Sequence, residues 1–330
     1  MSAAPGWTIG LDMGGTKCLG VVLDPTGRVR ATQQLPTRVG GEEVIGVFAG
    51  VADALIAEID GFADFGGRSA IAGVGAGLPG LVDREGRLSA APHLPGVHDL
   101  EVARLLEERL GLPVTADNDA TCAAWAEWQM GAGVGADDLL TVTIGTGIGG
   151  AFVVNGEIAR GAHGFAGEIG HMTVQIDGPA CICGRRGCWE LFASGNALGA
   201  MGRVSARQGG VPGVVELAGG ASAVTGEHVT RAAAGGDADA IRLVEELGRG
   251  IALGLANLTL VLDPGLIVLG GGTLERIVDV LLVAVRESFA SQFGRSNGRR
   301  VLPEIRAAAL GPQAGAIGAA LLASARSQTN

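Results

Sequence analysis

The chain has 330 residues, of which 58 are Gly, and 47% of its residues are hydrophobic while 18% are charged. So many apolar residues can bury a core, and the Gly residues follow no period of three, so the composition excludes intrinsic disorder and collagen. The net charge of −10 argues against a nucleic-acid partner, and the length indicates two domains.

The first part of the chain is expected to alternate strands and helices. Val44, Val47, Val51 and Leu55 recur at spacings of three and four, which predicts a helix. In chain order we expect strands at residues 7–11 and 18–23, a third strand after a turn at 24–27, a helix at 42–59, a strand at 70–75, a helix at 100–110 and a strand at 113–116.

A second round of similar elements follows. Both rounds open with a strand, a Gly-rich loop and a returning strand, so we expect an internally duplicated α/β architecture. The expected elements are a helix at 120–130, a strand at 138–144, a loop at 145–150, a strand through Val154 ending in an Asn155-Gly156 hairpin, mostly helices beyond about Gly195 with a loop at 209–226, a core helix at 251–262, a strand at 266–269 and a helix at 314–325.

The chain gives no sign of export or of a membrane span. Residues 1–6 lack a basic region followed by an apolar one, so we expect no secretory signal and a cytoplasmic protein. The apolar stretch at 251–262 is too short for the roughly 20 residues that a membrane helix needs. The five Cys are an odd number, which favours metal binding or burial over a disulfide framework.

Two Gly-rich loops follow strands and are candidates for binding phosphate. Small residues let backbone amides approach phosphate oxygens, and Asp12, directly before the first loop, could orient Mg²⁺ carried by a nucleotide. The alternative is a pair of tight hairpins, since neither loop is a Walker A sequence and neither opens a helix. The candidate residues are Asp12, Gly14, Gly15, Thr16 and Lys17 in the first loop and Gly145, Thr146, Gly147 and Gly149 in the second.

A cluster of thiols indicates a metal site. Cys181, Cys183 and Cys188 lie within 18 residues of His171, and three sulfurs with one imidazole suit structural Zn²⁺. The alternative is three reduced Cys with an unrelated His, and His163 is a less favoured substitute ligand. Cys18 and Cys122 lie in a predicted strand and helix and are expected to be core residues.

Carboxylates at the ends of elements are the third signal. Asp119 follows a strand and could accept a proton from an alcohol, while Asn118, Glu168 and Glu190 could hold neighbouring hydroxyls. Each alone could instead be a helix cap, and Asp119 in particular could cap the helix that is expected from Ala120.

These motifs, taken in order, resemble the bacterial sugar kinases of the ROK family, most closely the glucokinases. The resemblance covers nearly the whole chain. It is carried by the loop at 12–17, the Gly-Leu-Pro-Gly run at 77–80, Asp-Asn-Asp-Ala at 117–120, the loop at 145–150, Gly-Glu-Ile-Gly-His at 167–171, the Cys-x-Cys-Gly-x-x-Gly-Cys-x-Glu signature ending at Glu190, and the late run at 269–272.

The resemblance implies a fold and a division into domains. The implied fold is α/β of the actin/hexokinase (ribonuclease H-like) type, duplicated, with two domains around a cleft. The small domain would comprise residues 1–118 and 313–330, and the large domain residues 119–312 would carry the zinc-binding loop. The family usually forms dimers or tetramers, so a homodimer or homotetramer is expected.

The resemblance also implies the reaction. Asp119 would be the general base that takes the proton from the sugar C6 hydroxyl as it attacks the γ-phosphorus of ATP with Mg²⁺. The sugar would be held by Gly80, Asn118, Glu168, His171 and Glu190, the adenosine side by a loop containing Gly271, and structural Zn²⁺ by His171, Cys181, Cys183 and Cys188.

The preferred reading is an ATP-dependent glucokinase, with several alternatives. One is a kinase for N-acetylmannosamine, N-acetylglucosamine or fructose, or a glucokinase that uses polyphosphate. Two non-enzyme alternatives are a ROK-type sugar-sensing repressor, for which an N-terminal helix-turn-helix would be needed, and a sugar-binding module without catalysis. His93 and Val97 depart from the commonest family pattern near the sugar, which leaves the hexose less certain than the reaction.

Overall fold

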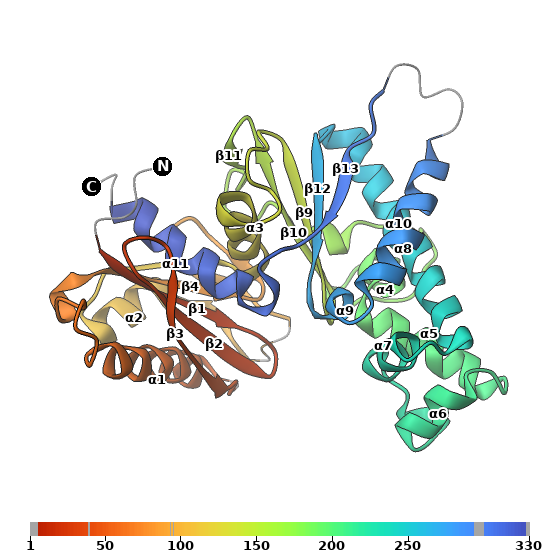
Figure 1. Cartoon of the computed structure of the whole chain (residues 1–330), viewed down its shortest axis with the longest axis horizontal. Coiled ribbons are helices and arrows are strands. Elements are labelled where there is room, and N and C mark those ends of the chain that lie inside the picture. Colours follow the sequence, from red (N-terminus) through yellow and green to blue (C-terminus); the bar gives the residue numbers. More distant parts are fainter. Residues whose placement is uncertain (1–5, 39, 93, 95, 294–299, 328–330) are drawn as a thin grey trace. The chain divides into compact units, whose positions relative to one another are not determined.

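The computed structural model of the protein describes residues 6–38, 40–92, 94, 96–293 and 300–327. The chain divides into two compact units (Figure 1). Unit 1 comprises Met1–Val134, Ile158–Gly167 and Pro312–Asn330, and unit 2 comprises Gly135–Glu157 and Glu168–Gly311. His93, one of the two departures from the family pattern, lies outside the described residues.

Unit 1 is built on a five-stranded sheet with the order β3-β2-β1-β4-β8. The pairs β1–β2 and β2–β3 are antiparallel, whereas β1–β4 and β4–β8 are parallel. The register aligns Asp12 with Gly77 and Gly77 with Asp117. Three neighbouring strands therefore present these positions side by side at their carboxyl ends. The strands are β1 (Trp7–Met13), β2 (Lys17–Leu23), β3 (Val29–Pro36), β4 (Ile71–Leu78) and β8 (Val114–Asn118).

The helices of unit 1 pack against this sheet. The predicted apolar spacing places Val44, Val47, Val51 and Leu55 on the buried side of α1, which contacts β2 and β3. α11 contacts β1, β4 and α3. The helices are α1 (Gly41–Ile59), α2 (Val102–Leu110), α3 (Asp119–Met130) and α11 (Ala314–Ser327), with a 3-10 turn η1 (Arg68–Ala70) and a small sheet of β5 (Leu81–Val82), β6 (Leu88–Ala90) and β7 (His98–Leu100).

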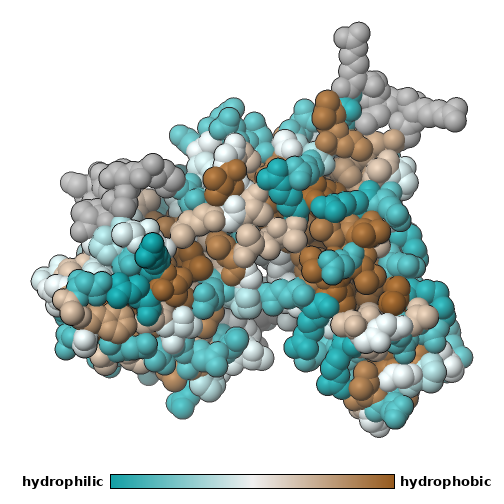
Figure 2. Space-filling model, in the orientation of Figure 1, coloured by the Kyte–Doolittle hydropathy of each residue, from teal (hydrophilic) through white to brown (hydrophobic). Residues whose placement is uncertain are grey.

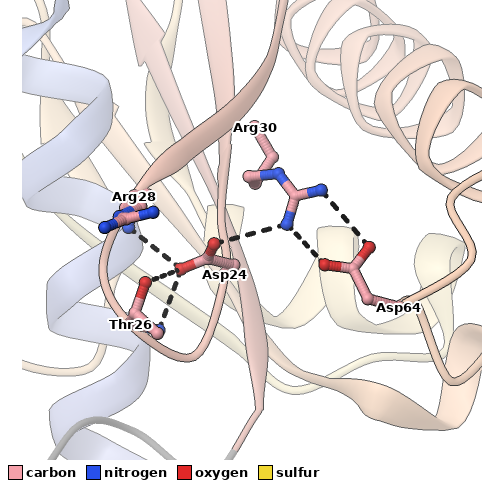
Figure 3. Close-up of polar contacts among 5 residues, drawn as sticks. All are labelled: Asp24, Thr26, Arg28, Arg30 and Asp64. Atoms are coloured by element: carbon pink, nitrogen blue, oxygen red, sulfur yellow. Dashed lines mark hydrogen bonds and ion pairs between the residues drawn. The ribbon is translucent and has the colours of Figure 1, made fainter.

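Arg30 ties together one edge of unit 1 (Figure 3). Its guanidinium lies 2.7 Å from Asp64 and 3.4 Å from Asp24, and it stacks 5.2 Å from the ring centroids of both Trp7 and Phe62. Asp24 is itself fixed by hydrogen bonds from the backbone amides of Thr26 and Arg28. Arg30 thus links β3 to the turn after β2 and to the segment after α1.

Unit 2 repeats the sheet plan of unit 1, which confirms the expected duplicated α/β fold. Its strand order is β11-β10-β9-β12-β13, with β9–β10 antiparallel and β9–β12 and β12–β13 parallel. The strands are β9 (Leu139–Ile144), β10 (Ile148–Val154), β11 (Glu157–Ile158), β12 (Leu266–Gly270) and β13 (Glu304–Ala307).

The rest of unit 2 is mainly helical. The expected core helix at 251–262 is the second half of a longer helix, α8, whose side chains Ile251 and Leu255 are fully buried. The remaining elements are η2 (Ile169–His171), α4 (Glu190–Ala193), α5 (Gly195–Arg207), α6 (Pro212–Ala218), η3 (Ala221–Ala223), α7 (Gly226–Ala234), α8 (Ala238–Leu262), α9 (Gly272–Glu275) and α10 (Val278–Gln292). The 3-10 turn η4 (Gly311–Gln313) begins at the last residue of unit 2 and continues into unit 1.

The expected loop at 209–226 is wrong, because α6 forms within it. Pro212 stands at the start of α6, where its missing amide hydrogen costs nothing, and Gly219 ends the helix with a positive φ of 73°. Val214 is fully buried and anchors the short helix to the core of unit 2. Val211 and Val224 are buried in the same core, and the abundance of Gly and small residues concealed these anchoring positions.

The surface carries both hydrophobic and hydrophilic residues, and the length and apolar character of the helices bear on whether they could span a membrane. On the face in view, hydrophobic residues are exposed among hydrophilic ones in both units (Figure 2). Within the described residues, no helix combines the length and the apolar character that a membrane crossing requires. The cytoplasmic location remains a prediction, as does the domain boundary between residues 118 and 119; α3, directly after that boundary, packs in unit 1.

Candidate active site

The carboxyl ends of β1, β4 and β8 bring two carboxylates together in unit 1. A Cβ atom on Gly77 would lie 3.4 Å from Oδ1 of Asp12 and 3.6 Å from Cα of Asp119. Asp12 and Asp119 therefore flank Gly77, whose missing side chain leaves room between them. On its other side Asp12 reaches Gly315, where a Cβ would lie 2.4 Å from Oδ2. Burial and then the charge of Asp119 raise the pKa of Asp12 to about 8.

Asn118 and Asp119 are held by the junction of β8 and α3. Asn118 is the N-cap of α3: its Oδ1 accepts from the amide of Thr121 at 3.1 Å, and its Nδ2 donates to the carbonyl of Gly80 at 3.1 Å. Asp119 is the first residue of α3, and its Oδ1 accepts from the amide of Ala120 at 2.8 Å. The capping alternative for Asp119 is therefore wrong, because Asn118 occupies the capping position.

The first Gly-rich loop is a tight turn between β1 and β2. The amide of Gly14 donates to the carbonyl of Lys17 at 2.9 Å, and Gly15, Thr16 and Lys17 are exposed. Thr37, which follows β3, supports the turn: its Oγ1 donates to the carbonyl of Gly14 at 2.6 Å and its amide donates to that of Thr16 at 3.0 Å. Sequence reasoning missed Thr37, since nothing in the motif points to a residue one strand further on.

The second Gly-rich loop lies between β9 and β10 in unit 2. The amide of Gly145 donates to the carbonyl of Gly147 at 3.0 Å, which closes the turn around Thr146. The amide of Gly195, the first residue of α5, donates to the carbonyl of Gly145 at 2.8 Å. Gly149 lies in β10 directly after the loop, opposite Thr143 of β9.

The late run of glycines meets this second loop. Gly271 has a φ of 97°, and a Cβ there would lie 2.6 Å from the backbone N and O of Ile144, at the end of β9. Thr273, two residues on, donates from Oγ1 to the carbonyl of Gly145 at 3.3 Å. The predicted phosphate and adenosine loops of unit 2 are thus adjacent, and Thr273 is a supporting residue that sequence reasoning missed.

Glu168, His171 and Glu190 form a second polar group in unit 2. Nε2 of His171 lies 3.8 Å from Oε2 of Glu168, and Nδ1 lies 3.5 Å from Oε1 of Glu190. Glu190 is buried and faces the phosphate loop, since a Cβ on Gly147 would lie 2.4 Å from its Oε2. Partial burial raises the pKa of Glu168. The nearby His171 lowers this pKa, and the negative charge of Glu190 raises it further.

The four predicted zinc ligands converge. The ligand atoms of His171, Cys181, Cys183 and Cys188 all lie within 4.8 Å of one another. Nδ1 of His171 is 3.7 Å from Sγ of Cys181, and the sulfurs of Cys183 and Cys188 are 3.6 Å apart. Zn–S bonds of about 2.3 Å in a tetrahedron place sulfurs about 3.8 Å apart, so this donor set fits Zn²⁺.

The loop that carries the thiols is a tight hairpin. Ala180 and Arg186 form an antiparallel bridge, and the amide of Cys181 donates to the carbonyl of Arg185 at 2.8 Å. Gly184 and Gly187 have φ values of 85° and 65°, a backbone conformation that Gly adopts readily and that the sharp turns of this hairpin require.

The sulfurs sit in different surroundings within this hairpin. Burial raises the pKa of Cys181 to about 12. Burial also favours a higher pKa for Cys183, but hydrogen bonds from the Arg185 amide and the other thiols outweigh it, so the pKa of Cys183 is below the ordinary value. His163 lies in the loop at 158–167 of unit 1, apart in sequence and in unit from the thiols, and Cys18 and Cys122 are fully buried as expected.

The chain is similar to known proteins along nearly its whole length. The sequence model of the ROK family matches residues 8–326. A glucokinase of Streptomyces coelicolor is 35% identical over 322 residues, which are 96% of this chain and 98% of that protein. An N-acetylmannosamine kinase of Escherichia coli O1:K1 is 35% identical over 266 residues, 80% of this chain and 82% of that one.

A solved structure resembles this one closely. The crystal structure of a ROK family glucokinase from Streptomyces griseus in complex with glucose and AMPPNP has 35% sequence identity and a TM-score of 0.83. The match covers 96% of this chain and 99% of that one. The family resemblance and the actin/hexokinase-like fold expected from the sequence are both confirmed.

Proposed function

The chain belongs to the ROK family and has sugar kinases among its relatives, and on that premise we propose that it transfers the γ-phosphoryl group of ATP to the O6 hydroxyl of glucose. The observation that carries the proposal is the strand end in unit 1, where Asp119 stands beside Asn118 and near Asp12. This arrangement provides one carboxylate that can accept a proton, a side-chain amide that can bind a hydroxyl, and a second carboxylate that can bind a cation.

Asp119 acts as the general base. Its carboxylate accepts the proton of the O6 hydroxyl as that oxygen attacks the γ-phosphorus, and the bond to the ADP oxygen breaks. Asn118 keeps its N-cap bond to Thr121, which fixes the side chain that holds a neighbouring hydroxyl, and the Gly80 carbonyl fixes its amide group. Glu168, His171 and Glu190 bind the other hydroxyls.

The two Gly-rich loops bind the nucleotide. In this proposal Thr16, Lys17 and Thr146 contact the phosphates, and the run that contains Gly271, which packs against the end of β9, contacts the adenosine. Asp12 would orient Mg²⁺, which would supply charge neutralisation of the phosphates when bound with ATP. Because the pKa of Asp12 is raised to about 8, the carboxyl carries a proton at neutral pH and would release it on binding a cation.

Zinc, when bound, gives His171 a fixed orientation. His171, Cys181, Cys183 and Cys188 would hold it, with Nδ1 of His171 toward the sulfurs and Nε2 on the side of Glu168. The role of the metal is structural, since four protein ligands fill a tetrahedral site and leave no open position for chemistry.

A panel of acceptors and donors tests the proposal. ADP release is measured with glucose, N-acetylmannosamine, N-acetylglucosamine and fructose, with ATP or with polyphosphate as donor. We expect the highest kcat/KM with glucose and ATP. A higher value for an N-acetylhexosamine would replace glucose as substrate, and no turnover of any hexose would contradict a kinase. Light scattering of the same sample tests the expected homodimer or homotetramer.

A further inference from the structure

The loop at 158–167 is a part of unit 1 that the reaction described above leaves unused. Its first residue, Ile158, is the last residue of β11 in the sheet of unit 2, yet the contacts of the segment as a whole place it with unit 1. The loop closes on itself, since the amide of Ala166 donates to the carbonyl of Arg160 at 3.2 Å. Gly164 packs against β5, where a Cβ would lie 2.8 Å from the carbonyl oxygen of Val82.

Two arginines fasten this loop. Nη2 of Arg84 donates to the carbonyl of Gly161. Nε of Arg160 donates to Oδ2 of Asp117 at 2.9 Å, with 29% of the Arg160 side chain and 11% of the Asp117 side chain exposed. The two contacts differ in kind, because Arg84 meets a neutral carbonyl whereas Arg160 neutralises a buried carboxylate.

Asp117 connects this ion pair to the residues at the strand end. Its second oxygen, Oδ1, accepts from the amide of Asn118 at 2.8 Å. The carboxylate thereby joins Arg160 on one side to the peptide that leads into Asn118 and Asp119 on the other. Removing the arginine would leave a buried, uncompensated charge next to that peptide.

The electrostatic surroundings point the same way. The buried thiol of Cys122 in α3 has its pKa raised by burial and by the charges of Asp117, Asp12 and Asp119, while Arg160 opposes them. All four charged groups therefore act on one small volume. The neighbouring strand β4 has no charged residue, and none of the described side chains of α11 is charged, so neither element contributes a charge to this volume.

We propose that Arg160 is a positioning residue: by clamping Asp117 it fixes the peptide between Asp117 and Asn118, and with it the side chains of Asn118 and Asp119. Arg160 itself touches neither substrate. It also cancels one of the negative charges beside Asp119. This inference rests on the proposed function insofar as its catalytic consequences are concerned, but its local effect on the backbone does not.

Steady-state kinetics test the catalytic consequence. Arg160→Gln is expected to lower kcat about 10- to 100-fold and to raise the KM of the sugar a fewfold, with little change in the KM of ATP. Arg160→Lys keeps the charge and is expected to recover much of the loss. The matched control is Arg84→Gln, which removes the neutral anchor of the same loop and is expected to change kcat less than twofold.

The pH profile separates positioning from a general loss of stability. In Arg160→Gln the charge of Asp117 is unopposed, so the acid limb of kcat/KM moves to higher pH by about 0.5–1 unit. In Asp117→Asn it moves to lower pH, and in the double variant the two effects cancel. Limbs that stay in place, or that move alike in Arg160→Gln and Arg84→Gln, would overturn the proposal.

Amide hydrogen exchange gives a test that needs no substrate. In Arg160→Gln the amides of Asn118 and Thr121 are expected to exchange at least tenfold faster than in the unchanged protein, because the bonds to Asp117 and to the N-cap loosen. Arg84→Gln should leave both rates unchanged. Unchanged rates in Arg160→Gln refute the clamp even if no hexose is phosphorylated, so its failure is distinct from failure of the proposed function.

Discussion

Asp12 illustrates how the fold alters the chemistry of a single side chain. Its raised pKa, about 8, follows from burial and from the charge of Asp119, so the folded protein holds a proton there that the unfolded chain releases near pH 4. This group therefore contributes stability that is fully present below about pH 4 and is lost as the pH rises to about 8. Above that pH its contribution is constant.

The consequence is a pH-dependent difference between the protein and Asp12→Asn. Free energies of unfolding in urea, measured from pH 5.5 to 8.5 without divalent metal, should fall for the protein relative to the variant by up to about 1.4 kcal/mol per pH unit below pH 8. Comparing the two proteins cancels the titration of the groups that do not interact with Asp12. Parallel curves would show that Asp12 ionises normally.

The parallel part of the sheet explains why the sequence could predict that Asp12, Asn118 and Asp119 lie near one another. Asp12 and Asn118 lie at the carboxyl ends of β1 and β8, and Asp119 directly follows β8, so the alignment of these strand ends brings the three residues to one edge of the sheet. Thr37, Thr273 and Arg160 could not be found in this way. Each acts through hydrogen bonds to residues far away in the sequence, and no local sequence pattern records such bonds.

At the scale of elements, glycines explain how α11 packs on the sheet of unit 1. A Cβ on Gly75 would lie 1.8 Å from the carbonyl oxygen of Ala319, and one on Gly10 would lie 1.8 Å from that of Ala316. In α11 itself, Gly318 meets the carbonyl oxygen of Cys122 in α3 in the same way. Part of the Gly excess in the composition therefore serves close packing of backbone on backbone.

Gly75→Ala should consequently destabilise unit 1. The added methyl group must displace α11, which we expect to lower the free energy of unfolding by about 1–3 kcal/mol. Gly46→Ala in α1 is the control, because a Cβ there meets nothing within 4 Å and alanine favours a helix. Chemical denaturation measures both, and equal stability of the two variants would contradict this packing account.

The zinc hairpin makes its own prediction. Cys183→Ser should lower zinc content and weaken sugar binding at least tenfold, because His171 would join the metal to the sugar. Ile182→Ser, at an exposed position between two of the thiols, is the control and should change neither. Zinc is measured by atomic absorption and sugar binding by calorimetry. Unchanged sugar affinity after verified loss of zinc would refute the coupling.

For the whole molecule, the duplication was predictable because each half carries the same local sequence of strand, Gly-rich loop and returning strand. The position of the loop at 158–167 was not predictable, because it follows β11 in sequence yet packs with unit 1 through Arg160 and Gly164. Long-range packing of this kind depends on shape and on one partly buried ion pair, which composition and periodicity do not encode.

The most direct test of the central claim follows product formation by phosphorus NMR. With glucose, ATP and Mg²⁺ the protein should form glucose 6-phosphate and ADP, and Asp119→Asn should reduce kcat about 10²- to 10⁴-fold while sugar affinity changes little. Asp53→Asn, at an exposed position on α1, serves as the control. A phosphate on another oxygen, or undiminished turnover by Asp119→Asn, would contradict the account.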